Sequence, residues 1–255
     1  MYVFAYFMAS DLSQLDHRPA SLGRAALALL LLVPAPTIGV LFAMHLMPDT
    51  AIGKTIHLSA KVWLFAFPLI WLMLVERVKP KLPRWSWDGM GAGLITGGLI
   101  LAIIIGAWEL IGTRLVDITA FQEGMAKVGL DTPLKFLGFA ALVSFINALL
   151  EEYVWRWFVY SKWFELLKGL KLPAKPIAIP GAIGLAGVCF VLHHSLAMHV
   201  YFGWQANALA SLGIFIGGVT WSILYLKYKN IYAAYVSHIL ADIALFYVGY
   251  RIAFG

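Results

Sequence analysis

The sequence predicts an all-α polytopic membrane protein, a bundle of about seven transmembrane helices. Hydrophobic residues make up 62% of the 255 positions and charged residues only 13%, an apolar share far above that of soluble globular proteins. The basic residues lie in short connections between apolar segments, so the net charge of +6 indicates orientation in a membrane and not binding of nucleic acid. The single cysteine, Cys189, excludes a disulfide framework and a thiolate metal cluster.

Each predicted span approaches the roughly 20 apolar residues that a helix needs to cross a bilayer. The seven spans are Ala25 to Met47, Ile56 to Val75, Met90 to Ile111, Pro133 to about Val154, about Ile177 to Met198, Ala206 to Leu226, and Ile231 to Ala253. Pro34 and Pro36 should kink the first span because proline cannot donate a helical hydrogen bond. The glycine pairs Gly93–Gly97 and Gly213–Gly217 should let the third and sixth spans approach neighbouring helices closely.

The distribution of lysine and arginine predicts a cytoplasmic N-terminus, and we expect the membrane to be a bacterial inner (plasma) membrane. That side then holds twelve basic residues, Arg18, Arg24, Arg77, Lys79, Lys81, Arg84, Lys162, Lys168, Lys171, Lys175, Lys227 and Lys229. The opposite side holds five, Lys54, Arg114, Lys127, Lys135 and Arg251. Two basic residues remain inside spans: Lys61, which we expect near a helix end where it can reach the surface, and Arg156.

The stretch Leu149 to Arg156 places two carboxylates and a guanidinium inside an apolar run. Ionisable groups at membrane depth are costly and mark functional sites. Glu152 and Arg156 are four residues apart, so they share a helix face and can neutralise each other. Glu151 points about 100° away and needs a partner from another helix.

Aromatic and basic residues follow the glutamates and predict a belt at the membrane surface. The aromatic members of the belt are Trp155, Trp157, Phe158, Tyr160, Trp163 and Phe164. With this belt at the cytoplasmic surface, Glu151 would lie roughly 9 to 14 Å inside the membrane. His238, about seven residues past Ile231, would lie roughly 10 Å below the same surface, which matches the depth of Glu151.

Two further segments carry polar groups suited to meet Glu151. His193 and His194 lie in the fifth span, and His238 and Asp242 share a face of the seventh. Counted from Pro176, His194 would lie roughly 27 Å deep, too far to join the others. We therefore expect its helix to begin late, near Gly184 to Gly187, or to be preceded by a recessed non-helical stretch.

Three motifs in order, Glu151-Glu152-xxx-Arg156, Phe190-xxx-His194 and His238-xxx-Asp242, resemble those of the CAAX prenyl protease and bacteriocin-processing (CPBP, Abi-type) family of intramembrane glutamic or metalloproteases. The likeness covers about Leu134 to Leu245. It implies a helical bundle with an intramembrane cavity. The implied division is an N-terminal cytoplasmic or interfacial segment (1–24), accessory helices (25–132) and a catalytic core (133–255).

The resemblance implies hydrolysis of a peptide bond in a peptide or a membrane-anchored protein, with the lipid bilayer as surroundings. Glu151 would act as general base toward a water shared with His194. His238, oriented or charge-balanced by Asp242, would face the carbonyl oxygen as negative charge develops. Glu152 and Arg156 would support the site. Asn147 could hold the water or pack between helices, whereas His193 and His199 are expected to point elsewhere.

Position 242 departs from the commonest family pattern, which has asparagine. An ionised aspartate cannot donate to an oxyanion, so Asp242 must be protonated, serve His238 or ligate a cation. We favour chemistry without a cofactor, and the alternative is zinc held by Glu151, His194 and His238. A non-catalytic peptide-binding immunity protein and a proton-coupled transporter are further alternatives, although transport predicts inverted half-repeats that the sequence does not display.

Overall fold

The computed structural model describes residues 21–77, 86–170 and 175–255, and in these ranges all regular structure is helical. Seven helical segments are long and apolar enough to cross a membrane: Leu22–Leu46, Ala51–Val75, Met90–Leu115, Pro133–Gly169, Ile177–Met198, Trp204–Tyr228 and Tyr232–Phe254. The predicted fold class is therefore confirmed. Residues 1–20 of the predicted N-terminal segment, and the basic residues Arg18, Lys79, Lys81, Arg84 and Lys171, lie outside the described ranges.

The first three spans are each divided into shorter helices. The first comprises α3 (Leu22–Leu32), α4 (Pro34–Val40) and the π-helix η1 (Leu41–Leu46), and the second comprises α5 (Ala51–Ile70) and η2 (Trp71–Val75). The third comprises α6 (Met90–Ala107), η3 (Trp108–Gly112) and α7 (Thr113–Leu115), and the short α8 (Ile118–Lys127) follows. The division between α3 and α4 falls at Val33, directly before Pro34, although Val33 itself keeps right-handed helical dihedrals (φ −61°, ψ −39°), so the predicted kink stays a prediction.

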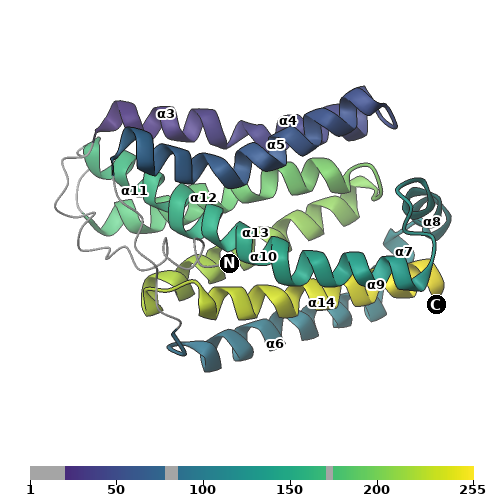
Figure 1. Cartoon of the computed structure of the whole chain (residues 1–255). Helices are drawn as coiled ribbons and strands as arrows, with labels where there is room; N and C mark the ends of the chain where they lie inside the picture. The colour runs from purple at the N-terminus through teal and green to yellow at the C-terminus, as the bar shows by residue number, and fades with distance from the viewer. Residues whose placement is uncertain (1–20, 78–85, 171–174) are drawn as a thin grey trace.

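The fourth span is one long helix with two π-helical sections. It runs through α9 (Pro133–Ala141), η4 (Leu142–Asn147), α10 (Ala148–Glu151), η5 (Glu152–Val159) and α11 (Tyr160–Gly169). The last three spans are α12 (Lys175–Met198), α13 (Trp204–Tyr228) and α14 (Tyr232–Phe254). In Figure 1, α3 to α5 form an upper layer, α11 to α13 the middle of the bundle, and α14 and α6 the lower side.

The predicted aromatic belt is wrong, because its residues form the centre of the protein. Trp155 is 0% exposed and Phe158 and Tyr160 are 2% exposed, and they belong to one core with residues of α3, α5, α12 and α13. The helix therefore continues past the glutamates inside the bundle and ends only at Gly169. Apolar aromatic side chains gain free energy equally from lipid and from a packed core, so the sequence pattern did not distinguish the two.

The late start predicted for the His194 helix is also wrong, because α12 is helical from Lys175 onward. Glu151 lies 18 residues before the end of α11, and His194 lies 19 residues after the start of α12. The two antiparallel helices pack against each other. Both residues therefore lie about 27 Å from the ends that the short connection joins. The error was to equate the start of α12 with the membrane surface, because His238, which lies 3.8 Å from Glu151, is only six residues past the start of α14.

One glycine pair brings the seventh span close to its neighbour. A Cβ atom at Gly93 would lie 2.4 Å from the Ala233 carbonyl oxygen, and one at Gly97 would lie 2.8 Å from the Ser237 Cα. The predicted close approach of the third span is thus confirmed, and it fixes α14 against α6. The prediction for Gly213 is wrong, since a Cβ there would meet nothing within 4 Å.

Candidate active site

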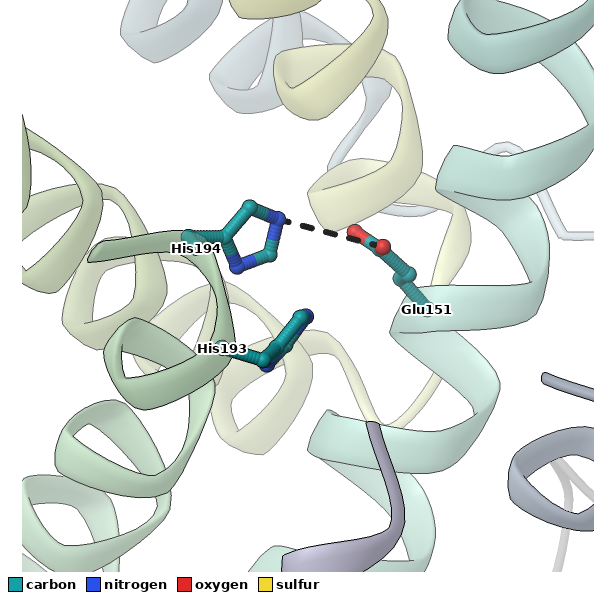
Figure 2. A group of neighbouring side chains, drawn as sticks. All are labelled: Glu151, His193 and His194. Atoms are coloured by element: carbon teal, nitrogen blue, oxygen red, sulfur yellow. Dashed lines mark ion pairs between the residues drawn. The ribbon is translucent and has the colours of Figure 1, made fainter. Parts of the chain in front are cut away.

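Glu151 and His194 face each other across the bundle (Figure 2). His194 Nε2 lies 4.0 Å from Glu151 Oε1, and His194 Nδ1 lies 2.8 Å from the Phe190 carbonyl oxygen. A carbonyl only accepts, so Nδ1 carries the proton, and in the neutral ring the lone pair of Nε2 faces the carboxylate. The His194 side chain is 30% exposed and that of Glu151 9%, so the site is accessible from the His194 side.

Glu152 is the hydrogen-bond partner of His238. Their atoms Oε1 and Nδ1 are 2.9 Å apart, and the Glu152 side chain is fully buried. The other ring nitrogen, Nε2, faces Glu151 Oε2 at 3.8 Å and Asp242 Oδ1 at 3.7 Å. The sequence predicted Asp242 as the residue that orients His238, whereas in the structure the direct hydrogen bond comes from Glu152.

Arg156 is held by α13 as well as by its own helix. Its Nε lies 3.7 Å from Glu152 Oε2, and both side chains are 0% exposed. Its Nη1 donates to the Gly218 carbonyl oxygen and to Ser222 Oγ, the latter at 3.1 Å. The predicted pairing of Glu152 with Arg156 is present within the fourth span, and the hydrogen bonds of Arg156 to Gly218 and Ser222 link this span to the sixth.

Aromatic rings fix the two imidazoles. Trp221 stacks on His238 with ring centroids 3.9 Å apart and an interplanar angle of 13°, and its indole nitrogen donates to Ser237 Oγ at 3.1 Å. Phe190 contacts His194 at 4.6 Å between centroids and lies under the Arg156 guanidinium at 5.0 Å. Stacking and edge contacts of this kind restrict the rings to one orientation.

His193 does not point elsewhere, contrary to the prediction. One ligand atom each from Glu151, His193 and His194 lie within 4.8 Å of one another, and Figure 2 shows the three side chains as neighbours. One carboxylate and two imidazoles form a donor set that zinc accepts, so these residues fit a metal. The sequence predicted Glu151, His194 and His238 as the zinc ligands, whereas the group found in the structure contains His193 and not His238. His199 instead stacks on His45, at 6.3 Å between centroids.

The prediction for Lys61 is wrong in its position. Because α5 begins at Ala51, Lys61 is eleven residues into a 25-residue span, roughly 15 Å from the helix start. Its side chain is exposed. Asn147 ends the π-helix η4 one turn before Glu151 and is half-buried.

The structure thus brings Glu151, Glu152, Arg156, His194, His238 and Asp242 into one buried cluster, whereas their chemical roles stay predictions. Fold and cluster together define an integral membrane protein with an acid and imidazole site among its helices. Residues 133–244 match the family model described as Type II CAAX prenyl endopeptidase Rce1-like. The predicted resemblance is confirmed for this region, which begins with α9 and contains the whole cluster, and the match supports a peptidase of the CAAX type. No curated protein and no solved structure matches the chain.

Sequence reasoning missed three contributors to the site: the polar partners of Arg156 on α13, the stacking of Trp221, and His193. Ser222 and Gly218 are four residues apart in an apolar helix, a spacing that hydrogen bonding within a helix explains equally well. Paired π-helical sections frequently accompany functional sites. Here η4 and η5 flank α10, which ends at Glu151, but no residue pattern predicted them.

Proposed function

We propose that this protein is an intramembrane endopeptidase that hydrolyses a peptide bond of a peptide or membrane-anchored protein substrate. One observation carries the proposal. The Glu151 carboxylate accepts no hydrogen bond from the described residues, and its Oε1 lies 4.0 Å from His194 Nε2, which we infer to be unprotonated. A single water with hydrogen bonds of about 2.8 Å can bridge that separation, and both neighbours would accept its protons.

In the proposed reaction, Glu151 takes a proton from this water while the water oxygen attacks the carbonyl carbon of the substrate. Both ring nitrogens of His238 face carboxylates, which accept, so we infer a doubly protonated ring. Its Nε2 proton is then available to the carbonyl oxygen as negative charge develops. Glu151 finally gives its proton to the leaving amine as the carbon–nitrogen bond breaks, which regenerates the carboxylate.

Two residues complete the proposed oxyanion site and its support. Asp242 Oδ2 is buried and has no hydrogen-bond partner among the described residues, so a proton on it could be donated to the oxyanion. Glu152 and Arg156 would act as positioning residues. Glu152 holds His238 at 2.9 Å, and Arg156 ties the helix of both glutamates to α13.

A zinc-dependent form of the same protease is the second candidate, because Glu151, His193 and His194 offer ligand atoms within 4.8 Å of one another. A zinc ion bound there would supply a Lewis acid and an acidified water. Chelation separates the two forms: loss of activity with a zinc chelator and recovery on adding zinc would favour the metal. We favour the metal-free form, because Glu151 as base and His238 and Asp242 as oxyanion donors would supply the proposed chemistry without a metal.

The proposal is tested by the cleavage products of a peptide and membrane-protein library incubated with the purified protein in lipid. Glu151→Gln should reduce cleavage by about 10²- to 10⁴-fold, the range expected for loss of a general base, while insertion in the membrane is unchanged. Glu109→Gln is the matched control, because Glu109 pairs with Arg251 in an exposed position away from the cluster. Undiminished cleavage by Glu151→Gln would overturn the assignment.

The proposal also includes a bacterial inner membrane as the location and a cytoplasmic N-terminus, and the distribution of basic residues along the sequence supports the orientation. With the seven spans found among the described residues, the C-terminus then lies on the opposite side. A reporter enzyme that is active only outside the cytoplasm should therefore be active when fused after Gly255, and an inactive fusion would contradict this orientation.

A further inference from the structure

His193 is a buried imidazole that the proposed hydrolysis does not use. It lies outside the three sequence motifs, it is 9% exposed, and its ring stacks on Trp155 with centroids 5.4 Å apart and an angle of 11°. Its Nδ1 is buried without a hydrogen-bond partner in the described part of the chain. Burial of an unpaired polar atom costs free energy, so this nitrogen requires an explanation that packing alone does not give.

The neighbours of His193 supply one. The ligand atoms of Glu151, His193 and His194 all lie within 4.8 Å of one another. Zinc binds imidazole and carboxylate at about 2.0 to 2.2 Å, which places tetrahedral ligand atoms roughly 3.4 Å apart. Small side-chain rotations of the three residues would bring their ligand atoms from within 4.8 Å to the roughly 3.4 Å that a tetrahedral zinc ion requires.

Two details favour a transition metal over a hard cation. Two of the three donors are imidazoles, which suit zinc, copper and nickel, whereas calcium and magnesium take oxygen ligands. The other ring nitrogen of His194, Nδ1, donates its N–H to the Phe190 carbonyl oxygen at 2.8 Å. A hydrogen bond of this kind orients metal-binding histidines in many proteins. His193 is held flat against Trp155 and is likewise preorganised.

The surroundings limit how tightly a cation can bind. Glu151 is the only carboxylate in the three-donor group. We therefore expect an exchangeable ion and not a permanently held one.

We propose that His193 completes a site for a zinc-type divalent cation with Glu151 and His194, and that the bound ion inhibits the protein by displacing the water between them. The inhibition rests on the proposed function, whereas the binding does not. The ion would use the same carboxylate oxygens and the same His194 nitrogen that the water needs, so the two cannot be bound together.

Cobalt(II) tests the binding directly, because its visible absorption bands report coordination by protein ligands without any activity measurement. Chelator-treated wild-type protein in detergent should bind one Co²⁺, and Zn²⁺ should displace it. His193→Ala should weaken Co²⁺ binding by about tenfold or more, in line with losses at metal sites. His193→Phe, which keeps a ring for stacking on Trp155, should weaken it equally and guards against a folding defect in the alanine variant.

His199→Ala is the matched control, because His199 is an exposed imidazole just past the end of the same helix and stacks on His45. It should bind Co²⁺ as the wild type does. Wild-type affinity in both His193 variants would overturn the site. If Zn²⁺ leaves cleavage by the wild-type protein unchanged or raises it, the proposed inhibition is overturned. Cleavage measured with chelator alone tests the proposed function separately.

Discussion

Replacing Glu152 with glutamine should destabilise the protein strongly, whereas the same change at the adjacent Glu151 should not. Glu152 lies 3.7 Å from the Arg156 guanidinium, and both side chains are fully buried. Glu151 is also largely buried, but its nearest ionic neighbours are imidazole nitrogens at 3.8 and 4.0 Å, beyond hydrogen-bond distance. The two neighbouring carboxylates therefore differ in what their charge supports.

The magnitude follows from the partner that each change leaves behind. Removal of one member of a buried ion pair typically costs about 3 to 5 kcal/mol, because the other charge stays buried without compensation. Glutamine retains an oxygen that can accept from His238, so we expect about 3 kcal/mol for Glu152→Gln. Glu151→Gln removes a desolvated charge that has no hydrogen bond to lose, and its effect should lie within about 0.5 kcal/mol or be stabilising.

The single cysteine provides the assay. Cys189 is a free, buried thiol, so a thiol-reactive dye reports unfolding during a thermal ramp in detergent. For a chain of this size, 1 kcal/mol corresponds to about 2 to 4 °C in Tm, so Glu152→Gln should lower Tm by about 6 to 12 °C. Equal Tm values for the two variants, or a larger loss at Glu151, would refute this division of structural and chemical roles.

Two further predictions concern α6 and α14. Gly97→Ala should lower the free energy of unfolding by about 1 to 3 kcal/mol through overpacking against Ser237, and it should reduce cleavage by shifting His238. Gly98→Ala is the control and should change neither, because a Cβ at that position has nothing within 4 Å. Equal Tm values and equal cleavage rates for the two variants would contradict this prediction. Asp242→Asn should retain cleavage, because an amide can donate where a protonated carboxyl would, and Asp242→Leu should lose about 10²- to 10³-fold in kcat. An inactive asparagine variant would show that Asp242 acts through its charge.

Composition and motif order determined the class of the protein. The length and hydropathy of the apolar runs are enough to place seven spans, because a bilayer sets the length of each helix directly. The cost of charge at membrane depth likewise singles out Glu151, Glu152 and Arg156 from the sequence alone. The division into segments 1–24, 25–132 and 133–255 stays a prediction.

Depth and partnership were decided only by the tertiary structure. Burial of an aromatic side chain is about as favourable in lipid as between packed helices, so the sequence could not reveal that Trp155 lies at the centre of the bundle. Helical spacing also could not show that Glu152, and not Asp242, holds His238 at 2.9 Å, or that His193 turns toward Glu151. The sequence sets which groups must avoid lipid, whereas the relative translation and rotation of packed helices decides which of them meet.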